Sequence, residues 1–189
     1  MAGGLRSSTS HSSAGDGGRI ELSDFTVRVA DASDTGRIAE IDAACFSTPS
    51  SIDSLESVVG SARVRVLVAE CVGPTRPGSA DPRSAVVGHG ILWYAADEAE
   101  LADLAVHPAF RRRGVAAILL DRLIGEARGT GVRAIFLEVR VSNDAAMALY
   151  VGRGFRPVGV RRHYYRRPME DGVILRLDLT SDESAPGSR

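Results

Sequence analysis

The most constraining feature of the sequence is residues 104–116, LAVHPAFRRRGVA, in which an apolar run gives way to three arginines and a glycine. The run is typical of a strand end, and Pro108 cannot continue a central strand because it lacks a backbone N–H. Residues 115–128 then have the apolar spacing of an amphipathic helix. Backbone N–H groups at such a helix start have no intrahelical partner and point outward. The segment therefore predicts an anion site, which the backbone at Gly114 and Ala116 can approach closely.

The composition suits one globular domain. The chain has 189 residues, of which 44% are hydrophobic, enough for one sizeable core. We expect a domain at residues 24–180 between disordered tails at 1–23 and 181–189, because both ends have little to bury. The formal net charge of -1 does not indicate a nucleic-acid or membrane partner. With no signal peptide and no apolar run of bilayer length, the protein is expected to be cytoplasmic.

The cysteines and histidines do not suggest a metal or redox centre. Cys45 and Cys71 lie far apart in apolar segments and match no metal or redox spacing, so the sequence predicts buried free thiols. His89 and His107 stand alone, without ligand spacing, and are expected to be structural. We therefore expect no metal.

The hydrophobic pattern predicts strands and helices in a mixed order. Strands are predicted at 25–29, 64–72, 85–95, 99–106, 133–141, 154–160 and 173–179, and helices at 31–46, 52–59, 115–128 and 143–152. Strands of the first part are joined by loops such as 73–84 and should pair antiparallel, whereas the strand–helix–strand unit across 101–141 implies a right-handed parallel crossover. The predicted fold class is α/β (α+β mixed), with a central, mostly antiparallel sheet and helices on both faces.

Glu138 is a charged residue inside the apolar strand predicted at 133–141. It shares a strand face with Phe136 and Arg140, because side chains alternate between the two faces. A carboxylate there is partly desolvated, which disfavours its charged form and suits it to accept a proton. An ion pair with a neighbouring arginine would explain the same residue without catalysis, and spacing alone leaves both interpretations open.

Asn143 and Tyr150 are seven residues apart in the helix predicted at 143–152, so they share a face that could line a narrow ligand. A phenol in that place could protonate a departing thiolate. The alternative is a core aromatic residue with a satisfied hydroxyl, and spacing alone favours this alternative.

Residues 161–167, RRHYYRR, form the densest basic and aromatic cluster. Docking of a peptide by Tyr164 and Tyr165, contact with RNA by charge and stacking, and a solvated hairpin are all compatible with it. A solvated hairpin fits Arg166 and Arg167 best, and RNA contact fits least well.

The spacing Arg111-x-x-Gly114-x-Ala116 after a strand ending in Leu-Ala-Val-x-Pro resembles the acetyl-CoA pyrophosphate loop of the GNAT superfamily of N-acetyltransferases. It is neither a Walker loop nor a dinucleotide fingerprint. The element order over residues 25–179 also resembles the GNAT acyl-CoA N-acyltransferase fold. The resemblance implies acetyl-CoA as cosubstrate, with its pyrophosphate at Arg111, Arg112, Arg113, Gly114, Val115 and Ala116 and its pantetheine arm paired with Leu104, Ala105 and Val106.

A second string, LEVR-x-SN-x-x-A-x-x-LY-x-x-x-GF at residues 137–155, followed by R-x-x-YY, is similar to the RimI-type branch of GNAT. These are bacterial enzymes that acetylate the N-terminal alanine of a small-subunit ribosomal protein. By position, the resemblance implies Glu138 as general base, Tyr150 as proton donor and Asn143 as a CoA contact. It also implies a ribosomal protein N-terminus as partner, docked by Tyr164 and Tyr165 with Arg161 beside them.

The expected reaction is direct transfer in a ternary complex, with the N–H of Val106 polarising the thioester carbonyl. A terminal α-amine, with a pKa of about 7.7–8.0, is far more often neutral at pH 7 than a lysine, at about 10.4. Acidic residues at Asp97, Glu98 and Glu100 could attract a charged N-terminus, and of these Glu100 is assigned to the acceptor site, although a solvated strand start accounts for them equally well.

One departure from the RimI-type pattern concerns the acceptor. The family's F-P-W-S segment near the end of the first helix is FSTPS here, at residues 46–50. A GNAT enzyme acting on a small-molecule amine or a lysine therefore remains an alternative. A non-catalytic acyl-CoA-binding module is a further alternative, which the presence of both Glu138 and Tyr150 argues against.

Overall fold

The computed structural model describes residues 21–72 and 86–179, which form one seven-stranded sheet in the order β1-β2-β3-β4-β5-β7-β6. All neighbouring strands pair antiparallel except β4 and β5, which are parallel. The strands are β1 (Phe25–Val29), β2 (Val64–Cys71), β3 (Val86–Ala95), β4 (Glu98–Val106), β5 (Ala134–Arg140), β6 (Arg156–Arg166) and β7 (Met169–Asp178).

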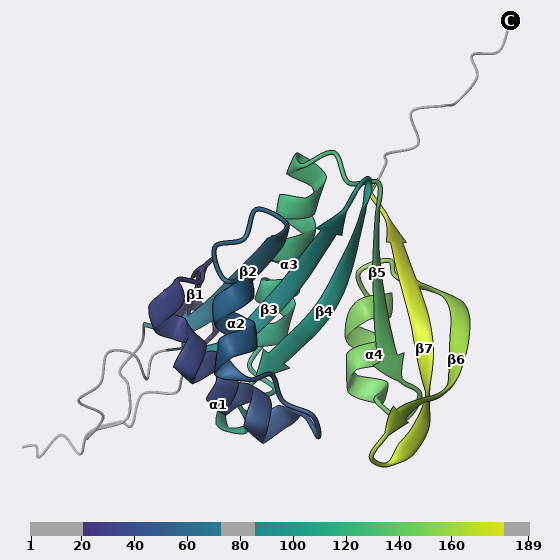
Figure 1. Cartoon of the computed structure of the whole chain (residues 1–189), viewed down its shortest axis with the longest axis horizontal. Coiled ribbons are helices and arrows are strands. Elements are labelled where there is room, and N and C mark those ends of the chain that lie inside the picture. Colours follow the sequence, from purple (N-terminus) through teal and green to yellow (C-terminus); the bar gives the residue numbers. More distant parts are fainter. Residues whose placement is uncertain (1–20, 73–85, 180–189) are drawn as a thin grey trace, which may run out of the picture.

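Helices cover both faces of this sheet, as predicted (Figure 1). The helices are α1 (Thr35–Cys45), α2 (Ile52–Val58), α3 (Val115–Gly129) and α4 (Asp144–Val151). On one face α1 packs over β3 and β4 and against α2, around a core that includes Ile38, Ile41 and Leu55. On the other face α3 and α4 bury Leu119, Leu123, Leu137 and Phe155. The predicted mixed, mostly antiparallel sheet is confirmed.

Three predicted boundaries were wrong by four residues or more. The last strand, predicted from residue 173, begins at Met169, where it pairs with the end of β6. The helix predicted from residue 31 begins at Thr35, because the carboxylates of Asp31 and Asp34 close a 3-10 turn at Ala32–Asp34. The strand predicted to end at 160 continues to Arg166 as the outer strand of the sheet, with register irregularities against β7. Nearly all its side chains are exposed, so the sequence lacks the alternation by which a strand is recognised.

The chain ends and the cysteines agree only in part with the predictions. The tail predicted at 1–23 lies outside the described residues up to residue 20, while Leu22–Asp24 form a 3-10 turn. The predicted 73–84 loop and the tail at 181–189 also lie outside them. Cys71 is buried as predicted, whereas Cys45 is only half-buried because it lies at the last turn of α1. Within the described ranges, no helix is long and apolar enough to cross a membrane.

The feature that positions the site is the divergence of β4 from β5. The two strands pair only at Glu98–Ala134, Ala99–Ile135 and Glu100–Phe136. Just beyond, β4 contains a bulge at Ala102, the residue skipped in the register between Leu92–Leu101 and Ile91–Asp103. Bulges bend a strand and increase its twist. In Figure 1 the strands lie together at the top and separate downward, and α4 is visible in the opening.

Candidate active site

The start of α3 has the properties predicted for an anion site. Its N-cap is Gly114, with a φ of 84°, and no side chain caps the helix. Since Ile118 is the first residue to bond back to Gly114, the N–H groups of the first turn have no intrahelical acceptor. A Cβ at Gly114 would lie 2.9 Å from Cδ1 of Leu22, an exposed side chain that can move aside, so the positive φ is the main reason for glycine at this position. An uncapped helix start can accept a diphosphate.

The three arginines before Gly114 are not equivalent. The guanidinium of Arg111 turns back onto the protein, donating to the carbonyl of Val106 at 3.1 Å and lying 3.3 Å from Sγ of Cys45. Arg112 is exposed and adopts a positive φ of 63°. Arg113 is half-buried. The guanidinium of Arg111 therefore stabilises the turn, whereas the family resemblance implied that it contacts the pyrophosphate.

Beyond the short ladder with β5, the edge of β4 that faces β5 has backbone N–H groups without a strand partner among the described residues. The N–H of His107 donates to Val87 on β3. Because successive N–H groups alternate between the two sides of a strand, those of Leu104 and Val106 point toward β5. At these positions the ladder with β5 has already ended. An extended pantetheine arm can form hydrogen bonds with this edge. The family resemblance implied this pairing for Leu104, Ala105 and Val106.

Glu138 lies on β5 with the predicted orientation. Leu137 and Val139 point into the core, while Glu138 points to the other face and its side chain is 15% exposed. Its Oε1 lies 2.9 Å from Nη1 of Arg161, so the ion pair considered as an alternative is present. The partner is itself one of the predicted acceptor-binding residues.

Tyr150 reaches the same region from α4. It is buried, and its ring packs edge-on against Phe155 at 5.7 Å between centroids. Among the described residues, no hydrogen bond to its hydroxyl is found, so the satisfied core phenol considered from the sequence is not observed. Burial, and to a smaller extent Tyr165 and Asp103, raise the pKa of Tyr150 above its usual value. The phenol therefore keeps its proton at neutral pH, as a proton donor must.

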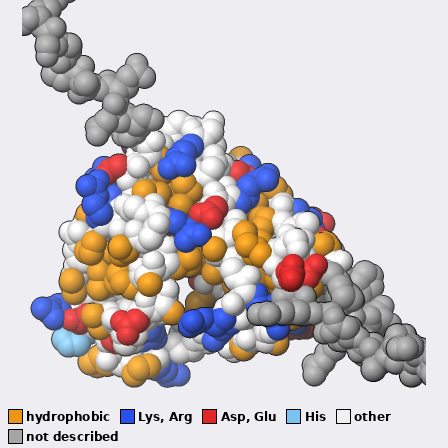
Figure 2. All heavy atoms as spheres, turned by 180° about the vertical axis from the view of Figure 1, so that it is seen from behind, with side chains coloured by type: hydrophobic (Ala, Val, Ile, Leu, Met, Phe, Trp, Pro, Cys, Tyr) orange, Lys and Arg blue, Asp and Glu red, His pale blue; other side chains and the backbone are white. Residues whose placement is uncertain are grey.

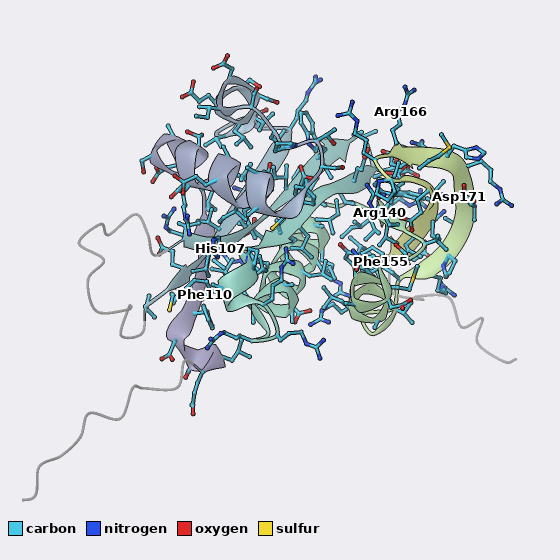
Figure 3. All side chains as sticks on the ribbon, turned by 90° about the horizontal axis from the view of Figure 1, so that it is seen from below. His107, Phe110, Arg140, Phe155, Arg166 and Asp171 are labelled. Atoms are coloured by element: carbon cyan, nitrogen blue, oxygen red, sulfur yellow. The ribbon has the colours of Figure 1, made fainter. Side chains whose placement is uncertain are left out.

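The β6–β7 hairpin brings the predicted acceptor residues to Glu138. The hydroxyl of Tyr165 donates to the backbone carbonyl of Glu138 at 3.3 Å, and the guanidinium of Arg140 lies 4.1 Å over its ring centre. Tyr164 packs edge-on against Tyr165, with Arg161 near its ring. These residues form one cluster on β5 and β6. In Figure 3, seen from below, Arg140 at the end of β5 and His107 just after β4 lie on opposite sides of the opening.

Two of the predicted site residues, Glu100 and Asn143, lie at the edge of the opening between β4 and β5. Glu100 is exposed on β4, at the last position paired with β5 and opposite Phe136. Asn143 is the N-cap of α4 and accepts from the N–H of Ala146, so it flanks the helix instead of lying within it. Its carboxamide N–H₂ is the part left to contact a ligand. Figure 2 shows the surface hollowed between the half with α3 and the half with α4, with arginine side chains at its lower edge.

Comparison with known proteins identifies the fold family. The model of the "Acetyltransferase (GNAT) family" matches residues 50–155, more than half of the chain. The chain belongs to the GNAT acetyltransferase family. Like other GNAT acetyltransferases, it is an N-acetyltransferase that uses acetyl-CoA.

The names of several similar proteins specify an activity within this family. Over 104 residues the chain is 42% identical to the ribosomal protein bS18-alanine N-acetyltransferase of Salmonella typhimurium, covering 54% of this chain and 69% of the relative. Over 81 residues it is 47% identical to the N-alpha-acetyltransferase RimI of Mycobacterium tuberculosis, covering 43% of this chain and 49% of the relative. The crystal structure of the ribosomal-protein-S18-alanine N-acetyltransferase from Escherichia coli superposes with a TM-score of 0.71 at 29% identity, covering 85% of this chain and 97% of that one.

The sequence reasoning missed a cluster under the opening of this acetyltransferase. His89, treated as a lone structural histidine, lies with Nε2 3.0 Å from Oδ1 of Asp42, and both side chains are fully buried. Asp103 on β4 lies near both. A signal was present, since Asp103 interrupts an apolar strand and Asp42 lies beside Ile38 and Ile41 on the buried face of α1.

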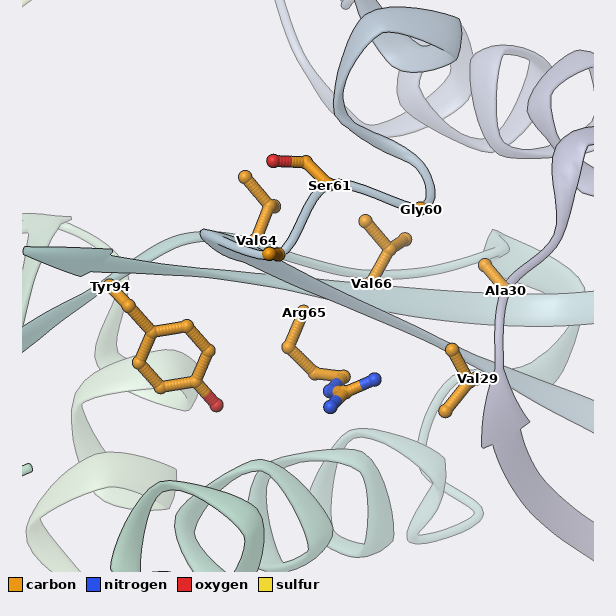
Figure 4. A pocket seen from close by; sticks show the side chains of 9 residues that line it. Val29, Ala30, Gly60, Ser61, Val64, Arg65, Val66 and Tyr94 are labelled. Carbon is orange, nitrogen blue, oxygen red and sulfur yellow. The ribbon is translucent and has the colours of Figure 1, made fainter. Parts of the chain in front are cut away.

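A small cavity at the start of β2 is separate from the candidate active site. That cavity has a volume of about 200 Å³ and is lined by residues from β1, β2 and β3, among them Val29, Arg65 and Tyr94 (Figure 4). None of the predicted site residues lines it. Among the described residues, no group of histidine, cysteine and acidic side chains could hold a metal ion.

Proposed function

We propose that this enzyme transfers the acetyl group of acetyl-CoA to the N-terminal α-amine of a protein, and that its acceptor is the N-terminal alanine of a small-subunit ribosomal protein. The names of the Salmonella and Escherichia coli relatives support this acceptor. A cytoplasmic location follows from the same acceptor. The observation that carries the proposal is the joint placement of Glu138 and Tyr150 at the opening between β4 and β5.

The residues of the chain fit acetyl-CoA along a continuous path. The uncapped N–H groups at Gly114, Val115 and Ala116 bind the pyrophosphate, with Arg112 and Arg113 adding positive charge. The N–H groups of Leu104 and Val106 pair with the pantetheine arm, and that of Val106 polarises the thioester carbonyl. The carboxamide of Asn143 contacts CoA from the start of α4.

The proposed chemistry uses one carboxylate and one phenol. Glu138 takes a proton from the acceptor nitrogen, directly or through a water, and Tyr150 gives a proton to the departing sulfur of CoA. Arg161 holds the carboxylate of Glu138 toward the acceptor. Tyr164 and Tyr165 dock the first residues of the peptide, and Glu100 adds negative charge where the acceptor enters.

The test is acetyl transfer measured by thiol release with matched peptides. We expect a peptide beginning with alanine to be acetylated with a higher kcat/KM than peptides beginning with serine or methionine, and than free polyamines. The same peptide with its N-terminus blocked and one internal lysine serves as the control and should be inert. Preferential acetylation of the lysine peptide or of polyamines would refute the assignment, and binding of CoA without any transfer would indicate a non-catalytic module.

A further inference from the structure

One carboxylate at the opening has no part in the mechanism above. Asp103 is the first residue of β4 after the bulge at Ala102 and pairs in register with Ile91. It comes three residues after Glu100, where pairing with β5 ends. Asp103 therefore stands where the two strands separate, next to Leu104 at the start of the edge proposed for the pantetheine arm.

Asp103 is partly shielded from solvent and lies near other titratable side chains. His89 pairs in register with Ala105, so Asp103 is its diagonal neighbour on the sheet face covered by α1. The titratable groups that interact electrostatically with Asp103 are Asp42 on α1, His89 on β3 and, through the opening, Tyr150 on α4. Asp103 itself is half-buried, and no hydrogen bond or ion pair within the described residues reaches its carboxylate.

These surroundings make the carboxylate of Asp103 a stronger base than an exposed aspartate. Burial first, and then the negative charge of Asp42, raise the pKa of Asp103, while His89 acts in the opposite direction. A carboxylate in this state gains by meeting a cation or by taking up a proton. Glu138 differs, because the guanidinium of Arg161 already lies 2.9 Å from it.

The reaction removes two protons from the acceptor nitrogen. An α-amine with a pKa of about 7.7–8.0 arrives mostly as an ammonium at neutral pH, and it must lose two protons before it becomes an amide nitrogen. One proton leaves before the nitrogen can attack, and the other leaves once the new C–N bond forms. We propose, on the basis of the function proposed above, that Asp103 is a catalytic residue that binds the acceptor ammonium and takes the first of these protons.

The proton transfers balance if Asp103 and Tyr150 act in sequence. An N–H bond of the ammonium breaks as the O–H bond on Asp103 forms, which leaves a nitrogen lone pair to attack the thioester carbon. Glu138 takes the second proton from that nitrogen and later releases it to water. Tyr150 protonates the leaving sulfur, and its phenolate regains a proton from Asp103. The sum is one amide, one thiol and one proton released to solvent.

The test separates deprotonation of the ammonium from the rest of catalysis. At about pH 6.5 only about one α-amine in twenty is neutral, whereas at about pH 8.5 most are. For Asp103→Asn acting on an alanine peptide, we therefore expect kcat/KM to fall about tenfold or more at the lower pH and to stay within about twofold of wild type at the higher pH. Glu56→Gln, which removes an exposed carboxylate on α2, should match wild type at both pH values.

An acceptor that carries no proton to remove before attack provides a second test of the role of Asp103. A peptide headed by an aminooxy group, which is uncharged at neutral pH, should be acetylated equally by wild type and Asp103→Asn. If the Asn variant does not fold, as judged by thermal unfolding, Asp103→Ser gives the same comparison. An equal loss at both pH values and on the aminooxy peptide, or full activity at the lower pH, would overturn the role of Asp103. If wild type acetylates no N-terminal amine, the proposed function itself fails.

Discussion

The guanidinium of Arg161 on β6 lies 2.9 Å from the carboxylate of Glu138 on β5. The arginine side chain is 56% exposed, so solvent screens the pair, and such pairs contribute only about 0–1 kcal/mol to stability. Its main effect is on geometry, because it fixes the direction in which the carboxylate points. The pair thus links a predicted acceptor-binding residue to the predicted base.

Replacing Arg161 should therefore affect catalysis more than stability. In Arg161→Met we expect kcat/KM for the alanine peptide to fall about tenfold, while the free energy of unfolding changes by less than about 1 kcal/mol. The control is Arg162→Met, which removes a neighbouring arginine that pairs with Asp171 instead. Equal losses of activity in the two variants, in steady-state kinetics, would argue against a specific role for Arg161.

Removing the two proposed proton carriers should lower kcat with little change in the KM for acetyl-CoA. For Glu138→Gln and Tyr150→Phe we expect losses of about 10²–10⁴, because general acid and base groups contribute in that range. Tyr94→Phe is the matched control, since it deletes a hydroxyl at the remote cavity of Figure 4. A wild-type kcat across pH in either active-site variant would contradict its assigned role.

Alanine at Gly114 should weaken CoA binding. The positive φ of this residue costs an L-residue about 1–2 kcal/mol, and the new Cβ would contact Leu22 at the helix start. Gly131 near the other end of α3 has nearly the same φ, 82°, with nothing within 4 Å of a Cβ. Thermal unfolding with and without CoA distinguishes them: both variants lose stability, but only Gly114→Ala should lose the ligand-induced increase in Tm.

Glu170 should make the hairpin sensitive to acid. Hydrogen bonding from Ser142 above all, and then the charge of Arg140, hold the pKa of Glu170 below its ordinary value near 4.5. A lowered pKa adds stability that is present above the ordinary value and lost as the pH falls through the lowered one. Glu170→Gln should therefore have a lower Tm than wild type at neutral pH.

The pH series for Glu170 has a defined end point. The difference in Tm between wild type and Glu170→Gln should shrink progressively as the pH falls below about 4.5 and through the lowered pKa of Glu170, since only below both pKa values is the carboxylate protonated in the folded and the unfolded chain alike. Glu56→Gln on the exposed face of α2 should show no such dependence. A Tm difference that persists unchanged into acid would show that packing, and not the charge of Glu170, is responsible.

Local sequence was sufficient for much of the fold. The alternation around Glu138 predicted which side chains of β5 face the core, and Pro108 and Gly114 predicted where the strand ends and α3 begins. Both inferences depend only on backbone chemistry and on the two-residue period of a strand. The exposed strand β6 was predicted too short, because it has no buried face and therefore no pattern.

By itself, therefore, the sequence determined the elements, the start of α3 and the family to which they belong, since these depend on residues close together in the chain. Only the tertiary structure decided that Arg161 reaches Glu138, that His89 meets Asp42, and that Asp103 stands in the opening. Those placements depend on strand register and on a single bulge in β4. A shift of one residue in a strand would turn its side chains, such as Glu138, His89 or Asp103, to the opposite face of the sheet.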